Sequence, residues 1–446
     1  MSSLLIVNAT VVNEGERFPA DIYCENGRIE EVGAALTHRQ ADKTIDAKGK
    51  LVLPGMIDDQ VHFREPGLTQ KGDMATESRA AIAGGITSFM EMPNVNPPTT
   101  NIEALEDKYT RANGRAAANY AFYLGATNDN LEQIQRLPKN IACGIKVFMG
   151  ASTGSMLVDD PKTLEGIFAD APILVATHCE DTPTIKLNEA AAREQYGDDV
   201  PISMHPIIRS EEACYKSSSL AVSLAKRFAT KLHVLHLTTA KELELFSQGD
   251  VDGKQISLEA CVHHLYLSEE DYETKGNGIK CNPAIKRAED RAALLEAVNN
   301  DVVDIIATDH APHLAEEKAW PFMQAPAGLP LVQHALPMLF DFYADGVMSV
   351  ETIVTKTSHN VAKRYQVVDR GYIREGYYAD LVIMDTQRPQ LVTKDNVRYK
   401  CGWSPFEGDT FGASVDTTII NGQIAYQYGQ SEPIQALGRR LEFSQD

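Results

Sequence analysis

Five side chains that could together hold metal ions lie within or directly after short apolar runs. They are His62, Lys146, His178, His236 and Asp309. Neutral imidazoles and carboxylates are ligands for zinc and similar divalent ions. A lysine ammonium has no lone pair, but a desolvated lysine amine can react with carbon dioxide to give a carbamate that bridges two metals. Two ions about 3.5–4 Å apart could hold a hydroxide and polarise a carbonyl group, which is the chemistry of metal-assisted hydrolysis.

Each residue taken alone also has a structural interpretation. A single histidine at a strand end is more often structural than a metal ligand. Lys146 could bury its stem and pair with a carboxylate, and Asp309 could cap a following helix. Because five such residues coincide with five apolar runs, the set as a whole predicts a metal centre.

These five residues need a fold that brings distant segments to one place. Between about residues 54 and 363, short apolar runs alternate with segments that have apolar residues at helical spacing. Eight strand–helix units predict a (β/α)8 barrel, in which functional residues lie at the carboxyl ends of the strands. The expected strands are residues 55–61, 86–92, 119–124, 144–149, 173–177, 232–237, 256–260 and 303–308.

Both ends of the chain have the pattern of β-structure. Apolar and β-branched runs predict strands at residues 4–12, 21–24, 28–32 and 380–384, and Asn421-Gly422 predicts the turn of a hairpin over residues 417–428. Two β-rich ends around a different middle predict one small β-sandwich built from both termini.

The α/β chain is therefore expected to have three stretches. Residues 1–53 form the first half of the sandwich, residues 54–365 form the metal-dependent barrel, and residues 366–446 form the second half of the sandwich with a C-terminal tail.

The composition is that of a globular protein. The 446 residues are 43% hydrophobic and 23% charged, and the net charge of -20 argues against a nucleic-acid or anionic-membrane partner. The seven cysteines include no CxxC pair, which argues against a disulfide framework and indicates a reducing compartment. With no signal-peptide pattern and no apolar run near 18 residues, the cytoplasm is the expected location.

Several motifs around these residues resemble those of dihydroorotases, a family of the amidohydrolase superfamily. The most specific are His-Phe-Arg-Glu-Pro-Gly at residues 62–67 and Thr-Asp-His-Ala-Pro-His at residues 308–313. The resemblance runs from the N-terminal β segment to about Tyr428. The other matching segments are Met92-Pro93-Asn94, residues 144–149, 178–181, 236–241 and 281–284.

The resemblance implies a role for each matching residue. The metal ligands would be His62, His178, His236 and Asp309. A carboxylated Lys146 would bind one zinc ion or bridge two. Asp309 would also be catalytic, because it would carry a proton from the attacking water to the leaving amide nitrogen.

A second set of matching residues is expected to bind the substrate. Arg64, Asn94 and His313 would hold a free carboxylate, for which the planar arginine fork is well suited. Asn282 and the backbone around Ala327 and Gly328 would contact the amide groups of the ring. Arg64 could instead form a surface ion pair, and His313 could support other site residues. The adjacent His263-His264 pair resembles one common in the family and is interpreted as structural or supporting.

One position departs from the family pattern. Gln60 stands where the first of two metal-binding histidines is expected, and an amide oxygen is a much weaker zinc ligand than imidazole. Three outcomes stay open: Gln60 binds weakly, water replaces it, or the centre holds one metal well and the other poorly.

The favoured activity is the reversible, metal-dependent hydrolysis of dihydroorotate to N-carbamoyl-aspartate, a step of pyrimidine biosynthesis. One alternative is another cyclic amide hydrolase, a hydantoinase or allantoinase, whose substrate would leave Arg64 without a carboxylate. The other is a non-catalytic dihydroorotase-like subunit that supports aspartate transcarbamoylase. Gln60 favours this second alternative, whereas the retained Asp309 and Lys146 argue against it. A homodimer is expected, and aspartate transcarbamoylase is kept as a second potential partner.

Overall fold

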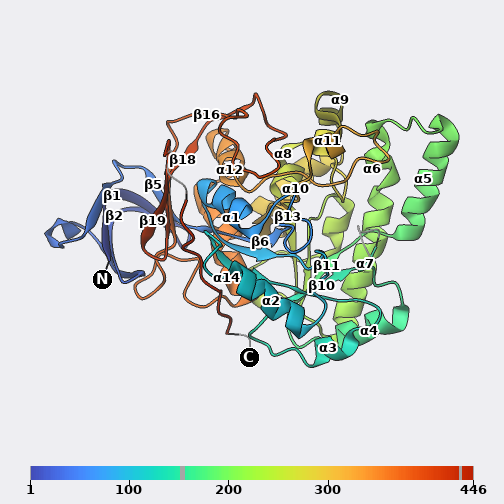
Figure 1. The fold of residues 1–446 in the computed structure, drawn as a ribbon, viewed down its shortest axis with the longest axis horizontal. Helices are drawn as coiled ribbons and strands as arrows, with labels where there is room; N and C mark the ends of the chain where they lie inside the picture. Colours follow the sequence, from blue (N-terminus) through green and yellow to red (C-terminus); the bar gives the residue numbers. More distant parts are fainter. Residues whose placement is uncertain (1, 151–155, 431–433, 445–446) are drawn as a thin grey trace.

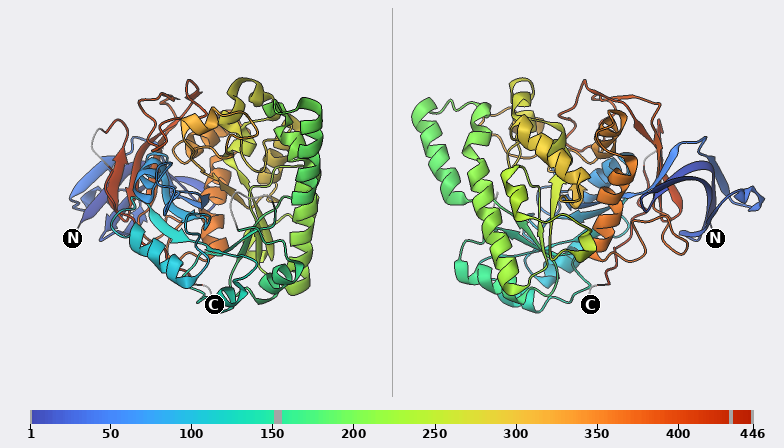
Figure 2. Two further views of the ribbon diagram at one scale, coloured as in Figure 1. Left: turned by 45° about the vertical axis from the view of Figure 1, so that its right-hand side comes forward. Right: turned by 180° about the vertical axis from the view of Figure 1, so that it is seen from behind.

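The computed structural model describes residues 2–150, 156–430 and 434–444. The middle of the chain forms a closed barrel of parallel strands with helices around it (Figure 1, Figure 2). Every run expected to be a barrel strand contains one, so the (β/α)8 prediction is confirmed. The barrel strands are β6 (Met56–Val61), β7 (Ile86–Glu91), β8 (Asn119–Phe122), β9 (Leu124–Gly125), β10 (Ile145–Phe148), β11 (Val175–His178), β12 (Leu232–Val234), β13 (Ile256–Cys261) and β14 (Ile305–Ala307).

Strands β8 and β9 act as one barrel strand that Tyr123 interrupts. β8 pairs with β7, and β9 pairs with β10, both in parallel. The barrel closes between its first and last strands, where Val61 forms a parallel bridge with His310 and the His62 amide donates to the His310 carbonyl at 2.7 Å. This closure brings residues at the two ends of the barrel sequence next to one another.

The barrel strands are buried on both faces, which explains why they appear as continuous apolar runs. All four residues of β10 are buried, and so are all six residues of β7. The apolar side chains of strands and helices share one large core.

Polar residues begin several of the surrounding helices. The Asp73 carboxylate accepts the amides of Ala75 and Thr76, and the Asp181 carboxylate accepts the amide of Thr184 at 3.0 Å. Such caps satisfy the first amides of a helix. The helices of at least ten residues are α1 (Met74–Ala83), α2 (Ile102–Ala112), α4 (Pro161–Asp170), α5 (Thr182–Tyr196), α7 (Glu211–Phe228), α10 (Ala288–Asn299) and α12 (Ala335–Ala344).

Shorter helices fill the loops between these elements. The shorter α-helices are α3 (Leu131–Gln135), α6 (His205–Ile208), α8 (Val262–Tyr266), α9 (Tyr272–Lys275), α11 (Ala315–Lys318), α13 (Val350–Val354) and α14 (Asn360–Tyr365). The remaining helical turns are η1 (Leu36–His38), η2 (Ile202–Met204), η3 (Lys241–Leu245), η4 (Val251–Gly253), η5 (Glu269–Asp271), η6 (Gly276–Ile279) and the π-helical η7 (Thr355–His359).

The two ends of the chain form one β domain beside the barrel, as expected (Figure 1). Its strands enclose a separate apolar cluster. The hairpin turns at Asn421-Gly422, whose φ angles of 48° and 73° are the left-handed values that this turn requires. In sheet order the strands are β19 (Gln423–Gln427), β18 (Ser414–Ile420), β15 (Leu381–Asp385), β5 (Leu51–Pro54), β1 (Ser3–Asn13), β2 (Glu16–Glu25) and β3 (Arg28–Gly33), and β4 (Lys43–Asp46) also pairs with β1; β16 (Gln390–Leu391) and β17 (Thr410–Phe411) form a separate pair.

A buried polar network joins the terminal sheet to the barrel. Asp380 accepts a hydrogen bond from Asn119 at the start of β8 and from the Asn421 amide of the hairpin turn, at 3.0 and 2.8 Å. Arg370 pairs with the same carboxylate, and both side chains are less than 5% exposed. The network lies where the expected terminal and barrel domains meet, although the expected boundaries themselves stay predictions.

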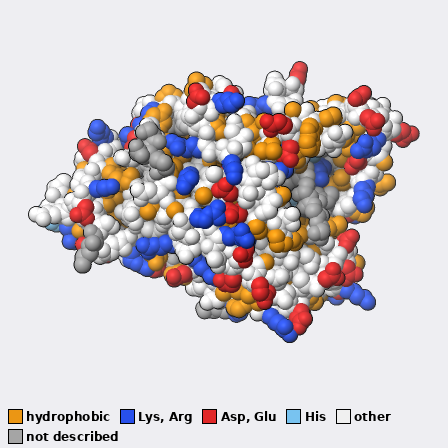
Figure 3. Space-filling model, in the orientation of Figure 1, with side chains coloured by type: hydrophobic (Ala, Val, Ile, Leu, Met, Phe, Trp, Pro, Cys, Tyr) orange, Lys and Arg blue, Asp and Glu red, His pale blue; other side chains and the backbone are white. Residues whose placement is uncertain are grey.

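The surface carries no broad basic patch on the face drawn in Figure 3, where Lys and Arg side chains lie among Asp and Glu side chains. Within the described ranges, no helix combines the length and apolarity needed to cross a bilayer.

Candidate functional site

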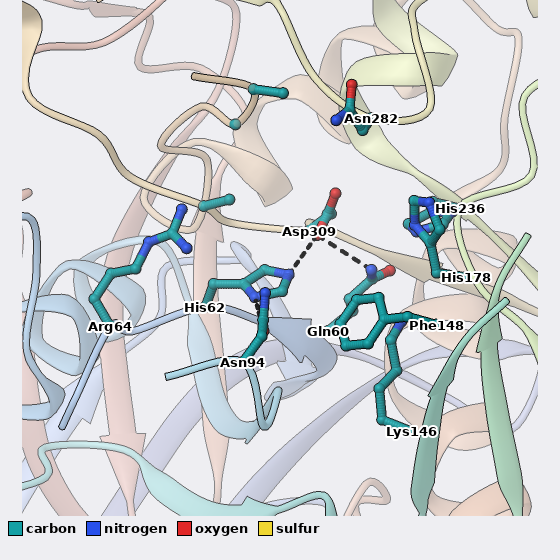
Figure 4. A pocket seen from close by; sticks show the side chains of 13 residues that line it. Gln60, His62, Arg64, Asn94, Lys146, Phe148, His178, His236, Asn282 and Asp309 are labelled. Carbon is teal, nitrogen blue, oxygen red and sulfur yellow. Dashed lines mark hydrogen bonds and ion pairs between the residues drawn. The ribbon is translucent and has the colours of Figure 1, made fainter. Parts of the chain in front are cut away.

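A pocket opens at the carboxyl ends of the barrel strands (Figure 4). It brings together eleven of the residues predicted for the site, together with Phe148 and Ala311. His313 is the twelfth predicted residue, and it contacts Arg64 beside the pocket. The lining residues are Gln60, His62, Arg64, Asn94, Lys146, Phe148, His178, His236, Asn282, Asp309, Ala311, Ala327 and Gly328.

Asp309 lies at the centre of one side of the pocket. Its Oδ1 atom is 3.0 Å from His62 Nε2 and 3.1 Å from Gln60 Nε2. His62 Nδ1 in turn lies 2.8 Å from Asn94 Oδ1, so the imidazole is held at both nitrogens. Burial lowers the pKa of His62, although Asp309 opposes this effect, and a neutral imidazole is the form that binds a metal.

A second pair of potential ligands lies on the other side. His178 Nδ1 and His236 Nε2 are 3.0 Å apart, and both rings are almost completely buried. Burial lowers the pKa of both histidines, so both are neutral at neutral pH. His178 Nε2 lies 3.0 Å from Glu180, which Arg209 also contacts. The carboxylate lies beside the ring of His178, where carboxylates commonly stand next to metal-binding histidines.

His236 retains one nitrogen without a hydrogen-bond partner among the described residues. This atom is Nδ1, and it is buried. The backbone amide of His236 donates to Glu259 Oε1 at 3.1 Å. The convergence of the two imidazoles and their neutral state fit a divalent metal ion.

Lys146 projects from β10 into the pocket between these two pairs of residues (Figure 4). Its side chain is 1% exposed, and its Nζ lies 4.7 Å from the centre of the Phe148 ring. Within the part of the chain that the structure describes, this nitrogen makes neither a hydrogen bond nor an ion pair. Burial lowers the pKa of Lys146 to about 8, so a larger fraction of this amine than of an ordinary lysine is neutral near neutral pH.

Arg64 places a buried positive charge at the opposite wall. Its Nε donates to the Pro312 carbonyl at 3.1 Å, and its Nη2 lies 3.0 Å from His313 Nε2. Lys71 approaches the other nitrogen of His313 at 3.0 Å. Burial, together with Arg64 and Lys71, holds the pKa of His313 far below its ordinary value, so this histidine is neutral and accepts one hydrogen bond, from either Arg64 or Lys71.

The Arg64 guanidinium has no carboxylate partner within the described ranges. It is 6% exposed, and burial lowers its pKa to about 10. An arginine remains charged at that pKa, and a buried charge is costly unless an opposite charge compensates it. The arrangement is suited to a bound anion.

The residues expected to contact the ring differ in whether they have a free hydrogen-bond donor or acceptor. Asn282 Oδ1 is buried without a partner among the described residues, and the side chain faces the pocket (Figure 4). The Gly328 amide already donates to the Lys280 carbonyl at 2.8 Å, and the Ala327 carbonyl lies 3.1 Å from His313 Nε2. Asn282 is therefore free to accept a hydrogen bond, whereas the Gly328 amide is not free to donate one.

Three site residues adopt left-handed backbone conformations. The φ angles are 70° at Arg64, 39° at His236 and 50° at Asp309. Such conformations cost about 1–3 kcal/mol each for residues other than glycine and persist where the surrounding structure enforces them. Each of these residues lies just beyond the end of a strand, and its backbone angle changes the direction of the side chain. No local sequence pattern predicts these angles.

Two other buried groups bring potential ligand atoms within 4.8 Å of one another. One consists of Cys261, His263 and His264 at the end of β13 and the start of α8, and His264 Nε2 lies 3.1 Å from the Pro283 carbonyl.

The second group consists of Asp59, His233 and Glu259, below the pocket in the barrel interior. Burial opposes protonation of His233, but the two carboxylates outweigh it and raise the pKa of His233 to about 9. The two carboxylates thus favour the protonated form of His233, and the group is an internal ion-pair cluster.

Several residues of the site were not predicted from the sequence. Phe148 lies two residues after Lys146 on the same strand face, so strand alternation could have indicated it. Lys71 and Glu180 lie in loops, and their contacts with His313 and His178 depend on the tertiary fold.

The model of the amidohydrolase family matches residues 51–425. A dihydroorotase from Methanosarcina acetivorans is 29% identical over 461 aligned residues, which cover 99% of this chain and 97% of that protein. An allantoinase from Salmonella choleraesuis is 29% identical over 448 residues, which cover 98% of each chain. The solved structure of L-hydantoinase (dihydropyrimidinase) from Arthrobacter aurescens has a TM-score of 0.93 and 27% identity, covering 99% of this chain and 100% of that one.

Proposed function

Because the chain belongs to the amidohydrolase family, whose model matches residues 51–425, we propose that it is a dihydroorotase. The reaction is the reversible hydrolysis of the cyclic amide of dihydroorotate to N-carbamoyl-aspartate, in pyrimidine biosynthesis. The similarity to dihydroorotases, an allantoinase and a hydantoinase supports the broader activity, the hydrolysis of cyclic amides.

The observation that carries the choice of substrate is the buried Arg64 guanidinium without a carboxylate partner in the described chain. Dihydroorotate carries a free carboxylate beside its ring, and a planar carboxylate can accept two parallel hydrogen bonds from arginine. Asn94 lines the pocket together with Arg64. The neutral His313 contacts the guanidinium at 3.0 Å and holds it in place. We assign Arg64, Asn94 and His313 to the binding of this carboxylate.

The residues on the other side of the pocket would hold the metal. His178 and His236 are two ligands, Lys146 is the third after carboxylation, and His62 and Asp309 extend the donor set. When bound, one or two zinc ions would polarise the ring carbonyl and lower the pKa of the attacking water.

The protein's own groups account for orientation and proton transfer. Arg64 and Asn94 fix the carboxylate end of the substrate, and Asn282 Oδ1 accepts a hydrogen bond from a ring N–H. Asp309 takes the proton of the attacking water and delivers it to the leaving nitrogen, so one carboxylate serves both half-reactions. Ala327 contacts the ring through its backbone in this proposal, and Gly328 lines the pocket beside it.

A second candidate function is the hydrolysis of another cyclic ureide, because an allantoinase and a hydantoinase are similar over nearly the whole chain. Neither hydantoin nor allantoin has a carboxylate for Arg64. The cytoplasmic location, the homodimer and a contact with aspartate transcarbamoylase stay predictions.

The test is a comparison of kcat/KM for dihydroorotate, hydantoin and allantoin with zinc-loaded protein. We expect dihydroorotate to be preferred by at least a hundredfold. A preference for either uncharged ring would contradict the proposal and favour the second candidate function.

A further inference from the structure

Gln60 lies at the floor of the pocket, where the first, seventh and eighth barrel strands meet. Its side chain is 1% exposed. Its Nε2 lies 3.1 Å from Asp309 Oδ1, and its Oε1 lies 3.7 Å from the Cys261 sulfur. Figure 4 shows the amide directed at Asp309. Both ends of the amide are therefore engaged by protein groups.

The chemistry of these contacts decides which amide atom faces Asp309. The amide nitrogen of Gln60 donates to Asp309 Oδ1 at 3.1 Å, as expected beside a carboxylate oxygen, which accepts. This nitrogen has no lone pair to give to a metal, because the pair is delocalised into the carbonyl group. The oxygen is the one atom of Gln60 that could bind a metal, and it faces Cys261 instead.

We infer that Gln60 is a positioning residue for Asp309 and not a metal ligand, and that the site uses one divalent ion held by His178, His236 and carboxylated Lys146. The inference rests on the proposed function. Three protein ligands leave a fourth position open for water or substrate, which is the arrangement of catalytic zinc sites.

The alternative position for the ion, beside His62 and Asp309, is less well equipped. Asp309 Oδ1 already accepts the Gln60 amide and also faces His62 Nε2. His178 Nδ1 and His236 Nε2, by contrast, converge at 3.0 Å as two neutral rings. An ion between these rings would replace one imidazole–imidazole contact with two metal–nitrogen bonds.

The same arrangement explains what Gln60 does for the reaction. His62 and Gln60 hold Asp309 Oδ1 from two directions, and Figure 4 shows the other carboxylate oxygen directed toward Asn282. The free oxygen thus faces the space in which a substrate ring would lie. Fixing a proton-transfer group in its productive orientation is a recognised contribution to rate.

The first experiment counts bound metal. Wild-type protein, Gln60→His and Gln60→Leu are equilibrated with zinc in bicarbonate buffer, freed of loose metal and analysed by elemental mass spectrometry. We expect one ion per chain in the wild type and in Gln60→Leu, and two in Gln60→His. Two ions in the wild type, or loss of the ion in Gln60→Leu, would overturn the inference.

A matched pair of variants locates the single ion. His236→Ala is expected to lower zinc affinity at least a hundredfold, whereas His62→Ala is expected to retain one ion per chain. The reverse pattern would overturn the assignment of the ion to His178 and His236. The counts for the wild type and Gln60→His remain decisive if either alanine variant fails to fold.

Kinetics separate positioning from a merely structural role. Gln60→Leu should lower kcat for dihydroorotate about tenfold or more, with KM and the metal count unchanged, because only the orientation of Asp309 is disturbed. An unchanged kcat would overturn the positioning role. If wild-type protein with two ions hydrolyses dihydroorotate, the inference fails and the proposed function stands. If it binds one ion but does not hydrolyse dihydroorotate, the metal count supports the inference while the proposed substrate fails.

Discussion

His178 Nδ1 lies 3.0 Å from His236 Nε2, although the two residues are 58 positions apart in the chain. The contact follows from the barrel, because β11 and β12 are neighbouring parallel strands whose carboxyl ends meet at one rim. Two neutral imidazoles can share at most one hydrogen bond, and they gain more from a cation placed between their lone pairs. The pair is the clearest structural sign of a metal site.

Asp309 is expected to be indispensable for turnover. Asp309→Asn keeps the size of the side chain but removes the base, and general acid–base catalysis typically contributes a factor of about 10²–10⁴. We predict that kcat for dihydroorotate falls by at least about a thousandfold, while the circular dichroism spectrum is unchanged. Activity within tenfold of the wild type would remove Asp309 from the proton-transfer role.

Arg64 is expected to act mainly on substrate binding. A hydrogen bond to a charged group contributes about 1.5–3 kcal/mol, so Arg64→Met should raise KM for dihydroorotate about tenfold to a hundredfold. Arg111→Ala is a matched control, since Arg111 is exposed and pairs with Asp107 one helical turn away. An unchanged KM in Arg64→Met would mean that the guanidinium does not bind the carboxylate.

The carboxylation of Lys146 should depend on pH. Only the neutral amine reacts with carbon dioxide, and burial lowers the pKa of Lys146 to about 8. About half of the amine is then neutral at pH 8, against roughly 0.4% for an ordinary lysine. Metal-free protein at a fixed concentration of dissolved ¹³CO₂ should therefore show a carbamate signal in NMR spectra that forms faster as pH rises from 6.5 to 8 and levels off above pH 8.

The matched control for that measurement is Lys146→Arg, which cannot form the carbamate in this way. A carbamate signal of the same size in this variant would place the modification on another lysine. A rate of formation that does not change with pH would contradict the proposed reactivity of a buried amine.

The polar network between sheet and barrel should be essential for stability. Asp380→Ala would leave Arg370 buried and uncompensated, and removing one partner of a buried ion pair typically costs about 3–5 kcal/mol. We predict a clear decrease in the urea midpoint of unfolding. Asp198→Ala is the control, because Asp198 is fully exposed and its contact with Arg193 is 4.0 Å long. Equal midpoints for the two variants would contradict the role of the network.

The barrel could be predicted from the sequence because its strands are buried on both faces and therefore appear as apolar runs. Lys146 and His178 could be identified for the same reason, because burying a polar residue in or after such a run is costly unless it has a binding partner. The terminal hairpin was predicted because Asn421-Gly422 fits a left-handed turn.

Contacts made between distant loops could not be predicted in this way. The sequence marked Gln60 as a departure from the family pattern, but its hydrogen bond to Asp309 and its contact with Cys261 depend on how β6, β13 and β14 meet. The left-handed backbone conformation of Arg64 could not be predicted for a similar reason, because tertiary packing and not the local sequence enforces it. The free Asn282 oxygen likewise became apparent only in the structure.

The most direct test of the central claim is dihydroorotate hydrolysis by metal-free protein during a zinc titration in bicarbonate buffer, followed by ultraviolet absorbance with metal counted on the same samples. We predict turnover that depends on zinc and saturates at one ion per chain. Bound zinc without turnover of dihydroorotate would contradict the assignment as a dihydroorotase, and protein that neither binds zinc nor hydrolyses the substrate would favour a non-catalytic scaffold.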